Sequence, residues 1–375
     1  MQIVRLSTAV PQSEYSTEEL MKQFPCELRE PVAQNIHNLG VIKRHLIDHP
    51  CFTGKGETPM KETALTDLCC QACDKVIREA DLHPKDVDCF VSSYDANPFL
   101  SPGLSQLLIP KLGLNPFVRY VNVQGIASTA FTKTLQVAGD YLAAKPRGKV
   151  LICVSGVSSF WFQNQVRGLK DVAEIAKIGK IEDSRHRQAE LRKWVATLQF
   201  FLFGDGVAAA IVSNMEGGLR VGQIEEVTNV DEKDYLAGYT RLTCFDEPFK
   251  FGIQSHLGKE IPDLGVKYTS LIIDRIFGDK HKNRIDSAKK WAVHTGSEKI
   301  LDALAEHHRV EKEKVEESHY VLRNNGNLAG ASLPFIIERI TSISNLSRGD
   351  RILMLAYGWG FSASAGLLDV QESFR

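Results

Sequence analysis

The sequence predicts an α/β fold built from two similar units. Short β-branched runs alternate with longer helical patterns, and the order strand-helix-strand-helix-strand occurs twice along the chain. The predicted strands are apolar enough to be buried on both faces of a sheet. The two units share little residue identity, so the predicted duplication is one of architecture.

The first unit is defined by three β-branched runs and two helical patterns. The apolar spacing predicts strands at 87–93, 117–123 and 149–156, separated by helices at 104–112 and 129–144. The second unit repeats this order nearer the C-terminus. Its strands are expected at 290–296, 318–325 and 351–360, and its helices at 298–307 and 331–342.

The repetition predicts two halves, 1–215 and 216–375. A charged stretch at 168–194, inside the first half, is expected to form a solvated helical insertion or lid, since charge runs usually mark exposed faces. Its basic side chains could also form a surface for an acidic carrier protein or a coenzyme phosphate. The residues of that surface would be Lys177, Lys180, Arg185 and Arg187.

Composition excludes several classes of function. The chain has 375 residues, with 45 Lys and Arg against 46 Asp and Glu, so no strong net field attracts nucleic acid or an anionic membrane. No apolar run is long enough to span a bilayer, and we expect a cytoplasmic protein. No metal site is expected, because the group Cys69, Cys70 and Cys73 is not followed by a second ligand pair.

Four segments in the order of a known family carry a more specific signal. They are SPGLSQLLIPKLGLNPFVRYVNVQGIAS at 101–128, LFGDGVAAAIVS at 202–213, WAVHTGSEKIL at 291–301 and NNGNLAGAS at 324–332. Together they resemble the type III polyketide synthases and the related ketoacyl-carrier-protein synthases. The resemblance implies the thiolase-like fold, in which two similar halves stack as five alternating layers, and normally a homodimer.

The resemblance implies site residues in both halves. His294 and Asn327 match the family's catalytic histidine and asparagine, which bind the thioester carbonyl and stabilise an enolate. Both residues follow predicted strands, so we expect them to converge on one pocket. Phe203 matches a phenylalanine between the pantetheine tunnel and the reaction cavity, although core packing explains an aromatic residue there equally well. Asp205, between two glycines, is expected to be structural.

The nucleophile of the family is missing. The turn that carries the family's cysteine reads Gln124-Gly125-Ile126-Ala127-Ser128, and an isoleucine side chain has no lone pair to attack a thioester. Ser128 lies two residues further along and would need a shifted turn to take the same place. An acyl-enzyme is therefore not expected at Ile126.

Three functions remain open. The first is a condensing enzyme that keeps the decarboxylation chemistry of His294 and Asn327 and joins malonyl-type and acyl thioesters without an acyl-enzyme. The second is a catalytically silent subunit that pairs with an active ketosynthase paralogue. The third is a binding protein for acyl thioesters or other small molecules. Retention of the histidine and asparagine favours the first.

The expected substrate carrier is coenzyme A or an acyl carrier protein, and no cofactor is implied. Plant members of the family place basic residues where this sequence has Val32, Asn35 and Leu39, so coenzyme A binding in that mode is doubtful. Lys43 and Arg44 remain as candidates for contacting the phosphates of a carrier.

Overall fold

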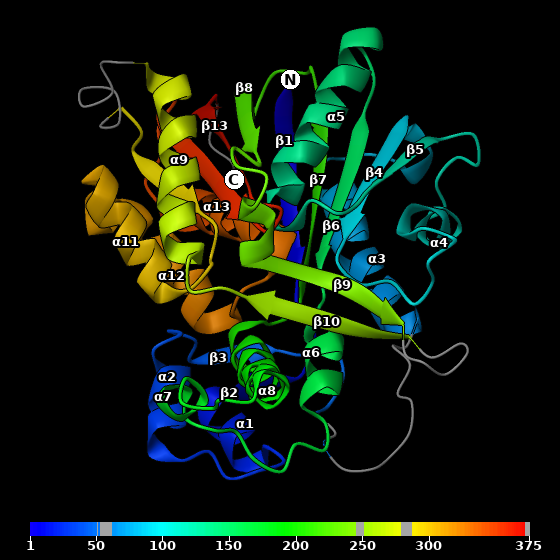
Figure 1. Cartoon of the computed structure of the whole chain (residues 1–375). Helices are drawn as coiled ribbons and strands as arrows, with labels where there is room; N and C mark the ends of the chain where they lie inside the picture. Colours follow the sequence, from blue (N-terminus) through cyan, green and yellow to red (C-terminus); the bar gives the residue numbers. More distant parts are fainter. Residues whose placement is uncertain (51, 53–61, 245–250, 279–286, 372–375) are drawn as a thin grey trace.

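The computed structural model describes residues 1–50, 52, 62–244, 251–278 and 287–371, and its main feature is a nine-stranded sheet (Figure 1). The strands lie in the order β11-β12-β13-β8-β1-β7-β6-β4-β5. Their bounds are β1 Gln2–Ala9, β4 Cys89–Tyr94, β5 Arg119–Val123, β6 Val150–Gly156, β7 Gly206–Ser213, β8 Leu219–Thr228, β11 Lys290–Val293, β12 Arg351–Gly358 and β13 Ser362–Val370.

The sheet consists of two half-sheets that meet at one seam. β1 and β8 pair antiparallel through two residue pairs, Gln2 with Arg220 and Ile3 with Leu219. On one side of this seam β4 pairs in parallel with both β5 and β6, and on the other β11 pairs in parallel with β12. The boundary expected at residues 215 and 216 falls in the connection between β7 and β8.

Helices cover both faces of each half-sheet, which gives the five alternating layers of the thiolase-like fold. One core joins both half-sheets to α5 (Ala130–Ala144) and α13 (Ser332–Ile343), which form the central layer. A second core packs α3 (Glu62–Glu79) and α4 (Leu104–Lys111) on the outside of the first half-sheet. A third packs α9 (Ile261–Phe277) and α11 (Glu298–His308) on the outside of the second.

The second unit departs from its predicted pattern in one element. Residues 318–325, which were expected to form a strand, are the end of helix α12 (Lys312–Asn325), which packs beside β11. Val315 and Leu322 of this helix are buried in the outer core, and Val321 is buried in the central core. The prediction was wrong because the short apolar run at 320–322 fits either a strand or a helix, whereas the apolar spacing over the longer segment is helical. Asn327 therefore follows a helix.

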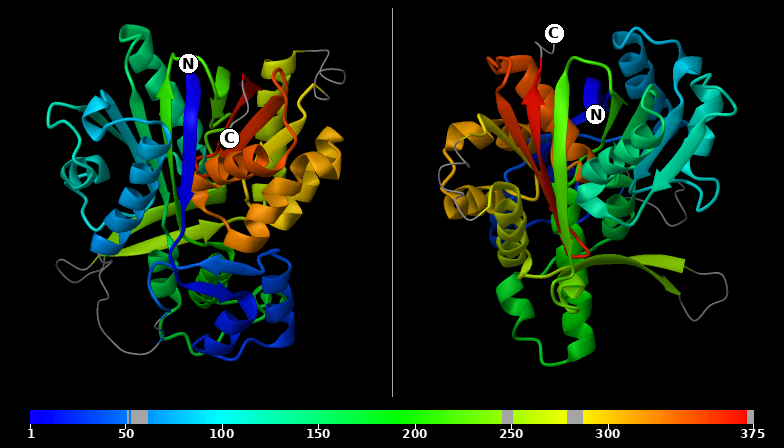
Figure 2. Two further views of the ribbon diagram at one scale, coloured as in Figure 1. Left: turned by 180° about the vertical axis from the view of Figure 1, so that it is seen from behind. Right: turned by 90° about the horizontal axis from the view of Figure 1, so that it is seen from above.

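A small lobe lies below the sheet and holds a fourth core (Figures 1 and 2). The charged segment 168–194 belongs to this lobe and contains α7 and the first part of α8. Aromatic rings of Phe24, Phe52, Phe200 and Phe201 contact one another in its core. The elements of the lobe are β2 Glu14–Ser16, α1 Thr17–Gln23, α2 Glu30–His37, β3 Lys43–His45, α6 Ser159–Val166, α7 Ile175–Ile178 and α8 Ser184–Leu202.

The hairpin of β9 (Gly238–Cys244) and β10 (Phe251–Leu257) runs between this lobe and the sheet (Figure 1). It contacts α8 through β10. The chain's described helices include none that combines the length and the apolar character needed to cross a bilayer.

Within the lobe, Arg44 of β3 contacts the end of α8. Its side chain is fully buried, and its guanidinium donates hydrogen bonds to the carbonyl oxygens of Phe200 and Phe201 and to the hydroxyl of Thr17. Carbonyl groups at the end of a helix have no partner within the helix, so a buried cation there satisfies them. Burial lowers the pKa of Arg44 to about 9.

We expect Arg44→Met to lower the free energy of unfolding by ~2–4 kcal/mol, because the change leaves buried carbonyls without a donor. Lys43→Met is the matched control, because Lys43 is half-exposed and its salt bridge with Glu14 lies at the surface. That change should cost less than ~0.5 kcal/mol. Denaturant unfolding of both variants measures the difference, and equal losses would contradict a capping role for Arg44.

Candidate active site

His294 lies at the carboxyl end of β11 and is held there by its backbone. Its N–H donates to the carbonyl of Leu355 at 2.9 Å, and its own carbonyl accepts from the hydroxyl of Tyr357 at 3.3 Å. The imidazole and the Tyr357 ring meet nearly at right angles, with centroids 5.4 Å apart. With 2% of its surface exposed, His294 is fixed in position inside the protein.

Burial determines the charge of His294. Desolvation lowers the pKa of the imidazole from 6.5 to about 3, so the ring is neutral at physiological pH. Its Nδ1 is buried and has no hydrogen-bond partner in the described part of the chain. A neutral imidazole has one N–H donor and one acceptor nitrogen, so His294 can either donate or accept a hydrogen bond.

Asn327 is positioned by the end of α12. Gly326 ends the helix with φ 72°, a left-handed conformation that glycine adopts without a steric penalty. The side-chain oxygen of Asn327 accepts from the N–H of Ala329 at 2.8 Å. This bond orients the carboxamide, and its NH2 group, a hydrogen-bond donor, is not engaged by it.

One hydroxyl connects the His294 and Asn327 segments. The Oγ of Ser332 shares a hydrogen bond of 2.7 Å with Oγ1 of Thr295, the residue after His294. The same Oγ accepts from the N–H of Leu328, the residue after Asn327, at 3.1 Å. The two predicted site residues are therefore flanked by residues that are bonded through a common partner.

The turn that contains Ile126 reaches the same region. Ile126 is partly buried against the central core, and Ala127 after it has φ 45°, which is uncommon for a residue with a side chain. Leu328 and Ala329 form a similar turn, with φ 47° at Ala329. The two turns lie together: a Cβ added to Gly330 would come within 2.5 Å of the Cβ of Ala130.

The Ile126 turn also contacts β12, whose Leu355 binds the backbone of His294. Ser128 is buried in this turn. The structure thus brings together the segments of His294, Asn327 and Ile126. The contacts between these segments are made by Thr295, Leu328 and Gly330. That the side chains of His294, Asn327 and Ile126 line one pocket stays a prediction.

Phe203 lies beside Asn327. The two residues form an isolated parallel β-bridge, in which the N–H of Asn327 donates to Leu202 at 2.9 Å and the N–H of Gly204 donates to Asn327 at 3.2 Å. The ring of Phe203 is partly buried and lies 4.6 Å from that of Phe162 on α6. It therefore places an aromatic side chain at the border between the sheet and the lobe.

The structure corrects the expectation for Arg44. Its guanidinium is buried and engaged with the end of α8, so it does not present a charge to the phosphates of a carrier. The sequence could not reveal the burial of Arg44, because two adjacent basic residues look alike in the sequence. In the structure Lys43 is half-exposed and Arg44 is buried. Lys43 lies 2.9 Å from Glu14.

Two carboxyl groups with buried oxygens adjoin β4 and β7 at the same end of these strands. Asp205 accepts hydrogen bonds from the N–H groups of Ile47, Ser158 and Ser159, which supports its expected structural role. Asp95 directly follows β4 and was not predicted. Burial raises its pKa to about 7, and its Oδ2 has no partner among the described residues. The sequence could have indicated Asp95 as a candidate site residue, because it follows a predicted buried strand.

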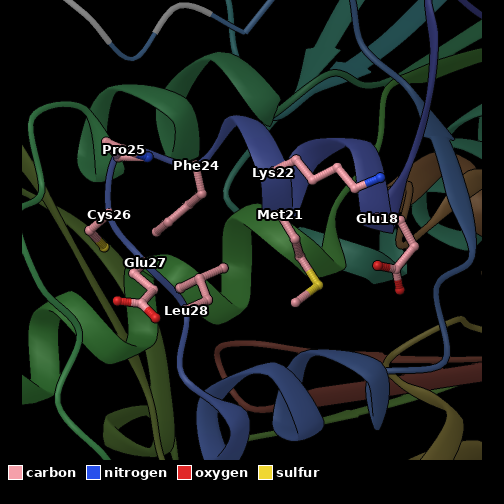
Figure 3. A pocket seen from close by; sticks show the side chains of 8 residues that line it. All are labelled: Glu18, Met21, Lys22, Phe24, Pro25, Cys26, Glu27 and Leu28. Carbon is pink, nitrogen blue, oxygen red and sulfur yellow. The ribbon is translucent and has the colours of Figure 1, made fainter.

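Other described features lie apart from this region. A pocket of about 460 Å³ opens on the lobe and is lined by residues of α1 and the segment that follows it (Figure 3). Its lining residues are Glu18, Met21, Lys22, Phe24, Pro25, Cys26, Glu27 and Leu28. Within the described ranges, no group of three or more His, Cys, Asp and Glu side chains is placed to hold a metal ion.

Known structures share the fold of the whole chain. The 1,3,6,8-tetrahydroxynaphthalene synthase of Streptomyces coelicolor A3(2), a bacterial type III polyketide synthase, superposes with a TM-score of 0.77 at 20% identity and covers 99% of this chain and 100% of its own. A structure of CsyB complexed with CoA-SH gives a TM-score of 0.78 at 19% identity, covering 98% and 99%. The chain therefore has the thiolase-like fold of these proteins.

Sequence comparison finds similarity to a family model and to curated relatives. Residues 247–369 match the chalcone and stilbene synthase C-terminal domain. The 3,5-dihydroxyphenylacetyl-CoA synthase of Amycolatopsis orientalis is 24% identical over 383 residues, which span 97% of this chain and 92% of the relative. The similarity to this relative thus extends over nearly the whole chain.

The depressed pKa of His294 predicts acid sensitivity. Below pH 6.5 the unfolded chain binds a proton at this residue, whereas the folded chain does not until about pH 3, so stability falls as the pH is lowered through this window. At pH 5 this effect amounts to ~2 kcal/mol. Between pH 7.5 and pH 5, wild type should therefore lose about that much more stability than His294→Gln in denaturant unfolding. Parallel losses in the two proteins would show that the imidazole is not held neutral.

Proposed function

We propose that the protein is a condensing enzyme that joins a malonyl-type thioester to an acyl thioester with loss of carbon dioxide and without an acyl-enzyme. The observation that carries this proposal is that the segments of a buried, neutral His294 and of Asn327, whose side-chain oxygen is already bonded within its own turn, lie together. Neighbours of these two residues are bonded through Ser332. A protein without chemistry has no need of such donors.

Decarboxylation places negative charge on a thioester oxygen. As the carbon-carboxylate bond breaks, its electron pair forms an enolate, and hydrogen-bond donors fixed in advance lower the energy of this state. We assign the two donors to the imidazole of His294 and the NH2 group of Asn327. The enolate carbon then attacks the carbonyl carbon of the second thioester, whose thiolate leaves. Phe203 would limit the access of water, which favours loss of the charged carboxylate.

The absence of a thiol at Ile126 determines how the second acyl group is held. With an alkyl side chain at this position no covalent bond forms, so the acyl thioester must react while bound by contacts alone. Proximity can lower a barrier by about 7–11 kcal/mol at best, which leaves room for such a mechanism. Ile126, and Ser128 in the same turn, would then serve as pocket wall.

Coenzyme A and an acyl carrier protein both remain as proposed carriers. CsyB, which has the same fold, was crystallised with CoA-SH, and this favours coenzyme A. Lys43 is half-exposed and is the remaining candidate for contacting the phosphates of a carrier. Lys180 and Arg185 are exposed on the lobe and offer a basic surface to a carrier protein. Both carriers occur in the cytoplasm, where we expect the protein to act. We infer a role in specialised polyketide or fatty-acid-derived metabolism, because a housekeeping elongation enzyme would be expected to keep its thiol.

A silent subunit of an active ketosynthase is the second candidate, and Ile126 is the residue that favours it. Such a subunit would lack turnover alone and would form a mixed dimer with a paralogue that has the cysteine. A binding protein for acyl thioesters is the third candidate, and it would bind its ligand without any turnover.

We expect the isolated protein to form a condensed product from malonyl-CoA and an acyl-CoA, and His294→Ala to lower this activity by about 100-fold or more. The matched control is His307→Ala, because His307 lies exposed on α11 and should leave the rate unchanged. Product formation is followed by mass spectrometry. Activity in His294→Ala equal to that of wild type would remove the imidazole from the mechanism.

Intact-protein mass spectrometry of the same reactions tests the missing acyl-enzyme. Wild type should carry no stoichiometric acyl adduct, whereas Ile126→Cys provides the positive control in which an adduct can form. A stable adduct on wild type would contradict a non-covalent mechanism.

A homodimer is the proposed assembly, and the open edge of the sheet supports it. β5 is an edge strand, and an unpaired edge is a template for pairing with another chain. Apolar side chains are exposed in β5 and in the connections near it in the chain: Phe117 is 94% exposed, Leu100 95% and Tyr120 44%. A two-fold axis beside β5 would bury them against the same residues of a second copy.

Light scattering should give twice the chain mass of 41.8 kDa for wild type. Phe117→Lys should shift the protein toward the monomer, because the change places a charge in the proposed interface. Met215→Lys alters an apolar residue that is 62% exposed in the connection between β7 and β8, and this control should stay dimeric. A wild-type monomer would instead favour the mixed dimer of the silent-subunit candidate.

A further inference from the structure

Gln199 is a buried polar side chain whose partners are missing. It lies on α8 and has no exposed surface, yet neither its Oε1 nor its Nε2 has a hydrogen-bond partner among the residues that the structure describes. A carboxamide can donate two hydrogen bonds and accept two. Folded proteins rarely leave such a group unpaired, and each exception calls for an explanation.

A neighbour on the same helix shows the ordinary arrangement. Thr197 is also fully buried, and its hydroxyl donates to the carbonyl of Lys193 at 2.9 Å. Local pairing of this kind satisfies a hydroxyl within its own helix. Gln199 makes no such bond in the described structure, so its partner must come from elsewhere.

The position of Gln199 connects it to the candidate active site. Phe203 follows four residues later as the C-cap of α8, so the two residues are separated by about one helical turn, or about 5.4 Å, along the helix axis. The carbonyl of Gln199 accepts from the N–H of Phe203 at 3.0 Å. Phe203 in turn forms the bridge with Asn327. An acyl chain extending from Asn327 past Phe203 would reach the carboxamide.

We propose that Gln199 determines substrate specificity by hydrogen bonding to an oxygen-bearing group on the acyl part of the thioester. The inference rests on the proposed function, since it takes an acyl thioester as the ligand. A hydroxyl group matches the carboxamide best, because it can accept from Nε2 and donate to Oε1 at once. An apolar acyl chain would leave both atoms unpaired, and the site would discriminate against it.

Binding of acyl-CoA pairs that differ by one hydroxyl tests this assignment without requiring turnover. Calorimetry would compare butyryl-, hexanoyl-, octanoyl- and phenylacetyl-CoA with their hydroxylated counterparts, the hydroxyl being placed at the far end of each acyl group. Wild type should bind the hydroxylated member of at least one pair about 10-fold more tightly, the effect of one good hydrogen bond. In Gln199→Leu, which has a similar volume, this preference should disappear.

Thr197→Val is the matched control, because it removes a buried hydroxyl on the same helix that already has its partner. It should keep the wild-type preference. The melting temperature separates a ligand-binding role from a structural one: Gln199→Leu should match or exceed wild type, because no protein hydrogen bond is lost.

Three results would overturn the inference. The first is that wild type binds both members of every acyl-CoA pair equally tightly. The second is that Gln199→Leu keeps the preference for the hydroxylated member. The third is that Gln199→Leu melts at a lower temperature than wild type, which would indicate that Gln199 binds a water molecule or a structural partner. Because binding is measured, loss of condensing activity alone does not affect the result. A protein that binds hydroxyacyl thioesters without turnover would contradict the proposed reaction and still support the role of Gln199.

Discussion

The close contact between two turns in the central layer is the constraint on which the site depends. One turn contains Ile126 and leads into α5, and the other contains Leu328 and leads into α13. Gly330 permits the contact, because a Cβ there would overlap the side chain of Ala130. The contact brings the starts of both central helices together, although they come from halves that are distant in sequence. A larger residue at Gly330 would push the Ile126 turn away from the Asn327 segment.

Most of the fold could be predicted because hydrophobic periodicity is a local property. The strands and helices around the Ile126 turn fall close to their predicted ranges, for example α5 at Ala130–Ala144 against 129–144. The prediction from hydrophobic periodicity was wrong where a short apolar run fitted either a strand or a helix, as in the last turns of α12. The sequence also placed His294 near the end of a strand, which was expected at 290–296 and ends at Val293 in the structure.

The environment of single polar residues could not be predicted, because burial depends on contacts between distant segments. Arg44 looked like a surface cation and is a buried partner of α8, 156 and 157 residues away. The sequence carried no signal at Gln199, whose carboxamide has no hydrogen-bond partner among the described residues. Family motifs indicated His294 and Asn327, and the hydrogen bonds through Ser332 came from the structure.

The alkyl group at Ile126 has a consequence for redox chemistry. Enzymes that depend on a reactive thiolate are inactivated when that sulfur is oxidised or alkylated. Of the cysteines whose side chains the structure describes, Cys69, Cys73, Cys89 and Cys153 are buried, and burial raises the pKa of the more accessible Cys26 and Cys70. A condensing reaction centred on an imidazole and a carboxamide would therefore continue in the presence of peroxide or electrophiles that silence a cysteine-dependent synthase.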